Sequence, residues 1–121
     1  MKTVETMTEA ILKGLEDKKG EDIQIIDISE ISPVADKFIL ATGNNRSQIQ
    51  AMADSVEEQM HKAGFSLKQV EGYASANWIL MDFIDVVVHI FDPESRSFYN
   101  LERIWKDGKM TRLEELRTSS Q

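Results

Sequence analysis

The stretch that decides the fold is Asn77–Phe91, NWILMDFIDVVVHIF, which carries the strongest β-strand signal in the chain. Its β-branched and aromatic residues favour strands, and the run is long enough for two strands and a turn. A two-residue turn at Phe83-Ile84 would pair residues across a hairpin as follows: Asp82 with Asp85, Leu80 with Val87, and Trp78 with His89. Ile84 is β-branched and resists the positive φ of such a turn, which leaves open a longer loop or a shifted register.

Side chains alternate across a strand, so this hairpin has two faces of different chemistry. One face is apolar throughout and is expected to lie under helices; it carries Ile79, Met81, Val86, Val88 and Ile90. The other face mixes aspartate and histidine with apolar side chains; it carries Trp78, Leu80, Asp82, Asp85, Val87 and His89. Because aspartate is almost never fully buried unless it is paired, we expect this second face to be partly open to water.

An open sheet face with Trp78 at its centre and acidic residues at its rim is typical of a protein-binding patch. An alternative interpretation packs Trp78 under a loop or under the C-terminal helix and leaves only the aspartates outside. The pattern alone does not separate the two interpretations.

Outward from the hairpin, helical and strand patterns alternate along the chain. The expected helices run from the N-terminus to Gly20, from the Gly43–Ser47 turn to Gly64, and near Tyr99–Lys106. The expected further strands are Ile23–Ile28, Lys37–Thr42 and a weaker one at Phe65–Glu71. The order αββαβββα predicts an α+β fold, a two-layer α/β arrangement in which helices cover a mixed sheet. We expect one domain at residues 1–108 and a polar tail at 109–121, in which Met110, Leu113 and Leu116 extend a helical pattern.

Composition restricts the kinds of site that the chain can build. The sequence of 121 residues has no cysteine and two histidines, which excludes disulfides and thiolate chemistry and removes the commonest zinc ligand. No signal peptide and no apolar run of about 20 residues is present, so we expect a cytoplasmic protein without a membrane span.

The charge balance bears on the choice of partner. Acidic residues outnumber basic ones by 21 to 14, giving a net charge of −7. Such a chain is repelled by a phosphate backbone, so direct nucleic-acid recognition is not expected. A basic protein surface suits it better, although negative charge also serves solubility alone.

Four blocks of the sequence resemble the bacterial ribosomal silencing factor family, also called Iojap-like. They are Asp27–Asp54, Glu71-Gly72, Trp78–Phe91 and Arg96–Trp105. With the N-terminal helix, these blocks span nearly the whole chain in the family's order and spacing. The sequence departs from the family at Ile84, in the hairpin turn, where glycine is usual.

The resemblance implies a nucleotidyltransferase-like fold without catalytic residues, and we expect no metal or cofactor. It implies that the chain binds the basic universal ribosomal protein L-fourteen on the large subunit and so blocks joining with the small subunit. It also implies a homodimer when the protein is free. We expect the contacts to come from the second hairpin face and its neighbour on the preceding strand, namely Trp78, Leu80, Asp82, Asp85, Val87, Glu71 and His89.

Two other function classes stay open at the level of sequence. A magnesium-dependent nucleotidyl transferase would need converging carboxylates beside a phosphate-binding loop. Gly43–Ser47 precedes a helix, but a turn and a helix cap explain its glycine and asparagines equally well. A protein-binding adaptor unrelated to ribosomes would use the same hairpin face.

Overall fold

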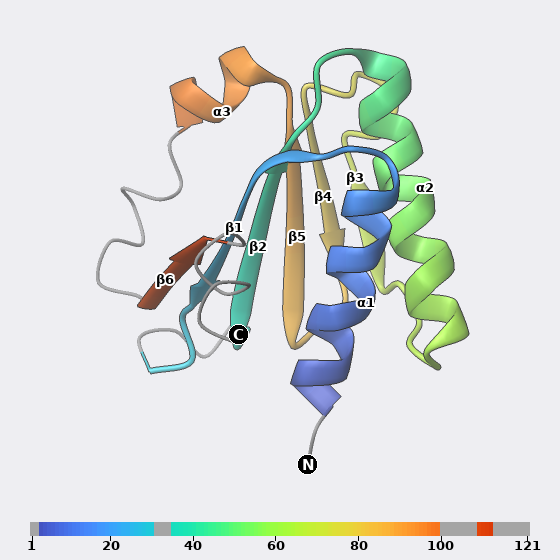
Figure 1. Ribbon diagram of the computed structural model, residues 1–121, viewed down its shortest axis with the longest axis vertical. Helices are drawn as coiled ribbons and strands as arrows, with labels where there is room; N and C mark the ends of the chain where they lie inside the picture. The colour runs from blue at the N-terminus through green and yellow to red at the C-terminus, as the bar shows by residue number, and fades with distance from the viewer. Residues whose placement is uncertain (1–2, 31–34, 100–108, 113–121) are drawn as a thin grey trace.

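The computed structural model describes residues 3–30, 35–99 and 109–112. These residues form a six-stranded mixed sheet in the order β3-β4-β5-β2-β1-β6. The strands are β1 Glu21–Asp27, β2 Lys37–Thr42, β3 Gln69–Glu71, β4 Trp78–Asp82, β5 Val86–Phe91 and β6 Lys109–Arg112. Strands β2 and β5 pair in parallel at the centre, and the remaining neighbours are antiparallel (Figure 1). The predicted α+β class with a mixed sheet is confirmed.

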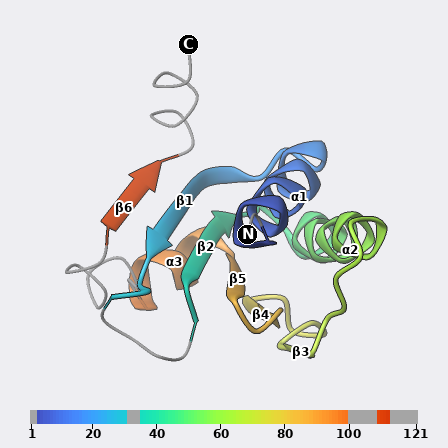
Figure 2. The same cartoon turned by 90° about the horizontal axis from the view of Figure 1, so that it is seen from below.

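Helices α1 (Thr3–Asp17) and α2 (Arg46–Lys62) lie side by side against one face of the sheet (Figures 1 and 2). Their buried stripes join the inward side chains of the strands in one apolar cluster. Gly14 permits the close approach of the two helices, because a Cβ there would lie 2.7 Å from the Cα of Val56. The two helices therefore form the second layer of a two-layer domain.

Helix α2 starts where the sequence predicts a cap. The side chain of Asn45 accepts a hydrogen bond from the backbone N–H of Gln48, with a distance of 2.8 Å between the heavy atoms. This bond satisfies one of the free N–H groups at the helix start. Asn45 is thus the capping residue among the candidates at the Gly43–Ser47 turn.

The C-terminal part differs from the sequence prediction. Helix α3 is Pro93–Tyr99, earlier than the expected Tyr99–Lys106, of which all but Tyr99 lies outside the described residues. Proline suits the first turn of α3 because its missing N–H has no helical partner there. The predicted helical continuation through Met110 is wrong, because Lys109–Arg112 forms strand β6 and pairs with β1. The backbone groups along that edge of β1 favour pairing over a helix, and the sheet extends past residue 108.

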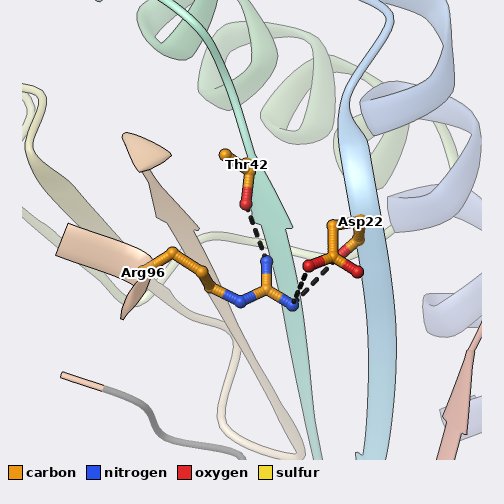
Figure 3. A network of polar contacts seen from close by, with 3 residues as sticks. All are labelled: Asp22, Thr42 and Arg96. Carbon is orange, nitrogen blue, oxygen red and sulfur yellow. Dashed lines mark hydrogen bonds and ion pairs between the residues drawn. The ribbon is translucent and has the colours of Figure 1, made fainter. Parts of the chain in front are cut away.

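Arg96 ties α3 to the ends of β1 and β2 (Figure 3). Its guanidinium donates to the hydroxyl of Thr42 at 2.8 Å and to the backbone carbonyl of Asp22 at 2.9 Å. The same group forms an ion pair with the Asp22 carboxylate at 3.5 Å. Arg96 and Thr42 are both only 7% exposed, whereas the Asp22 side chain is about half exposed. The two hydrogen bonds, one of them buried, contribute more than the half-exposed ion pair to the position of α3.

Replacing Arg96 by Met tests this assignment. Arg96→Met keeps most of the packing but leaves a buried hydroxyl and a carbonyl without their donor, so we expect the free energy of unfolding to fall by about 2–3 kcal/mol. Asp22→Asn is the matched control: it keeps the carbonyl and tolerates the φ of 49°, and should cost less than about 1 kcal/mol. Urea denaturation measures both variants. Equal losses would show that charge attraction, and not buried hydrogen bonding, holds α3.

Candidate functional site: the second sheet face

The sheet face turned away from α1 and α2 carries the candidate site, and we call it the second sheet face. Its side chains form a separate apolar cluster, in which Trp78 and Leu80 are only partly buried. Along β4 the burial alternates as predicted, since Ile79 and Met81 are buried under the helices. The predicted division of the hairpin into two faces is therefore confirmed.

The predicted pairing across the hairpin is wrong by two residues. The observed pairs are Asp82 with Val87, Leu80 with His89, and Trp78 with Phe91. A shift of two leaves every side chain on its predicted face, because the period of a strand is two. The observed register also avoids placing two carboxylates directly opposite one another, which is unfavourable.

The turn itself spans Phe83–Asp85. Two hydrogen bonds of 3.0 Å close it, one from the Phe83 N–H to the Val86 carbonyl and one from the Asp85 N–H to the Phe83 carbonyl. The second bond skips one residue, Ile84, whose φ is 76°. This is the γ-turn with positive φ, which is rare and strained for a residue with a Cβ. A carboxylate oxygen of Asp82 accepts the Ile84 N–H at 2.8 Å and helps to hold the turn.

Ile84→Gly should therefore stabilise the protein. Glycine adopts positive φ freely, and the Ile84 side chain is 58% exposed, so relief of strain outweighs lost burial. We expect the free energy of unfolding to rise by about 1 kcal/mol. Ile84→Ala is the control that keeps a Cβ and removes the exposed side chain, and it should change stability little. A rise with Ala equal to that with Gly would contradict the strained turn.

Four aromatic rings, those of Trp78, His89, Phe91 and Phe38, meet on this face. Trp78 stacks on Phe91 with 5.2 Å between ring centroids, and His89 meets Phe38 edge to face at 4.8 Å. The indole N–H of Trp78 donates to Nδ1 of His89 at 3.0 Å. Because Nδ1 accepts this bond, the neutral ring of His89 carries its proton on Nε2. That atom is buried and has no hydrogen-bond partner among the described residues.

Burial lowers the pKa of His89 to about 4. A cation in this apolar setting loses its hydration, and its formation also requires a proton on the nitrogen that accepts from Trp78. The ring is thus neutral at pH 7 and acts there as an acceptor.

A folded-state pKa below the unfolded value of about 6.5 makes stability depend on pH. The stabilising contribution is present above pH 6.5 and is lost as the pH falls towards 4, because the unfolded chain then binds the proton more readily. We expect His89 to account for a loss of roughly 3 kcal/mol over this window. Denaturation from pH 7 to pH 4 should show a smaller loss for His89→Asn, which cannot titrate. Identical pH profiles would contradict a buried neutral His89.

The seven predicted contact residues divide by accessibility. Trp78, Leu80, Asp82 and Asp85 are partly exposed, and Glu71 is exposed opposite Leu80 on β3. Two residues are nearly inaccessible: Val87 is 7% and His89 is 3% exposed. Asp85 lies in the turn, where its carbonyl accepts from the N–H groups of Asp36 and Lys37.

Sequence reasoning missed the support that β2 gives to this face. Phe38 lies beside Val87, and Leu40 lies beside His89, through the parallel pairing of β2 with β5. The alternating pattern within a hairpin carries no information on such a distant neighbour.

The Gly43–Ser47 turn uses its polar groups within the protein. The Asn44 N–H donates to the side chain of Gln48 at 2.7 Å, and the Asn44 amide donates to the carboxylate of Glu21 at 3.2 Å. The negative charge of the Glu21 carboxylate disfavours the binding of a phosphate group at this turn. Across residues 3–30, 35–99 and 109–112, no group of three metal-binding side chains comes together. None of the helices in these ranges is long and apolar enough to span a membrane.

Comparison with known proteins gives consistent relatives. A family model described as ribosomal silencing factor during starvation matches residues 1–121. The ribosomal silencing factor RsfS of Bacillus subtilis is 42% identical over 99 residues, which cover 82% of this chain and 84% of that protein. The chloroplast protein Iojap of Zea mays is 35% identical over 106 residues, 87% of this chain and 45% of that longer protein.

Solved structures agree with the fold. A crystal structure of a Chromobacterium violaceum protein superposes with a TM-score of 0.81 at 36% identity and covers 83% of both chains. A second crystal structure, from Bacillus halodurans, superposes with a TM-score of 0.77 at 34% identity, covering 88% of this chain and 96% of the other.

Proposed function

This chain belongs to the ribosomal silencing factor family, and we propose that it is a translational repressor that docks on the large ribosomal subunit through its second sheet face. The family is named for an action on ribosomes and not for a reaction. The proposed action is therefore binding: the bound protein occupies the surface that the small subunit needs, so the two subunits do not join in the cytoplasm.

The observation that carries this proposal is the partly exposed pair Trp78 and Leu80 on β4. They form an apolar centre on β4, with the carboxylate of Asp82 at the other end of the strand from Trp78 and Glu71 opposite Leu80 on β3. A large aromatic side chain with an acidic rim fits an interface with a basic protein. The helical side of the sheet is already covered by α1 and α2.

We propose the basic universal ribosomal protein L-fourteen as the partner, as the family resemblance implies. The chain's net charge of −7 supports this choice, since opposite charges speed the encounter of two proteins. The same charge opposes binding through ribosomal RNA alone. The resemblance also implies that the free protein is a homodimer.

Trp78→Ala tests the docking surface. A tryptophan at the centre of an interface typically contributes about 2 kcal/mol or more, so the variant should bind large subunits about 30-fold more weakly. Sedimentation of purified large subunits with the protein measures the affinity, and addition of small subunits measures joining. The folded state of the variant is checked by circular dichroism.

Tyr73→Ala is the matched control. Tyr73 is an exposed aromatic residue that is bound to α2 instead, through its hydroxyl to Asp54 at 3.0 Å and its carbonyl to Gln50 at 2.9 Å. Its removal should leave binding and the block of joining unchanged. Wild-type protein that stays at the top of the gradient while the subunits join would reject the proposal and favour an adaptor role.

A further inference from the structure

We infer that His89 is a positioning residue: it holds the indole of Trp78 in the orientation that meets the partner and makes no contact with the partner itself. The inference rests on the proposed function for its consequence in binding. It replaces the sequence prediction that His89 is a contact residue, since only 3% of His89 is exposed.

The contacts of Trp78 define its orientation. Its N–H donates to Nδ1 of His89 at 3.0 Å, and its ring stacks on Phe91 with 5.2 Å between centroids. Stacking alone lets an indole slide or flip in its plane, whereas a directional hydrogen bond selects one orientation. The two contacts together leave Trp78 partly exposed in a fixed pose.

His89 is itself held firmly from both sides. It lies in β5, between Leu80 of β4 and Leu40 of β2, and its ring meets Phe38 edge to face at 4.8 Å. The acceptor for the indole is therefore fixed by the central strands of the sheet. A preorganised side chain loses less conformational entropy on binding, which raises affinity without a new contact.

A purely structural role does not account for histidine at this position. Its buried Nε2–H lacks a partner among the described residues, and an unpaired buried donor is destabilising. Phenylalanine would fill the same aromatic cluster without that cost. The polar group that His89 uses is Nδ1, and what Nδ1 does is accept the indole N–H.

Two variants of His89 distinguish a role in positioning Trp78 from a purely structural role. His89→Phe keeps a ring and removes the acceptor. His89→Asn removes the ring and keeps an acceptor, because its Oδ1 is attached to Cγ as Nδ1 is. The indole N–H of Trp78 is followed by NMR, with Trp105→Phe used to assign it among the two tryptophans. Affinity for purified large subunits and the urea midpoint are measured on the same proteins.

We expect His89→Phe to shift the Trp78 indole resonance, to speed its hydrogen exchange at least about tenfold, and to weaken large-subunit binding about fivefold. Its urea midpoint should stay the same or rise. His89→Asn should keep the indole protected and bind within about twofold of wild type, although its urea midpoint falls. Lower stability with retained binding in one variant, and the reverse in the other, is a pattern that a structural role does not produce.

The outcomes that overturn the inference are distinct from failure of the proposed function. Wild-type protein that does not bind large subunits rejects the proposed function, and the indole resonance still decides whether His89 fixes Trp78. Binding that depends on Trp78 but is unchanged in His89→Phe overturns the inference alone. The inference would also be overturned if both variants lost large-subunit affinity in proportion to the fall in their urea midpoints.

Discussion

The parallel pairing of β2 with β5 is the constraint on which the rest of the structure depends. All six residues of β5 are buried, as are the last five of β2. Two central strands of this kind must be covered on both faces, as in other parallel pairs. Helices α1 and α2 cover one face, and the side chains on the second face form an apolar cluster of their own.

This unequal covering links the fold to the function. Between the helices and the sheet, the apolar side chains are buried in one cluster that stabilises the fold. On the second sheet face, the same central strands support β4, whose outer side chains Trp78 and Leu80 stay partly open. His89 and Phe91 pack against Trp78, and Phe38 packs against His89 behind it. A partly exposed aromatic side chain that buried neighbours hold in place is the arrangement that a binding surface needs.

Sequence predicted the features that depend on local pattern. Alternation predicted the correct face for the side chains of the two hairpin strands, and the capping chemistry of the Gly43–Ser47 turn predicted the start of α2, where Asn45 is the cap. It could not predict the register of the hairpin, because Ile84 adopts a strained φ that its side chain disfavours. It also could not predict strand β6, since a short polar segment becomes a strand only when a distant edge is available.

The most direct test of the central claim is hydroxyl-radical footprinting of the protein with and without large ribosomal subunits. If the second sheet face docks, oxidation of Trp78 slows several-fold on binding, while oxidation of Tyr73, which lies against α2, continues at its original rate. Protection of Tyr73 with Trp78 oxidised as fast as in the free protein would contradict the account and place the docking surface on the helical side.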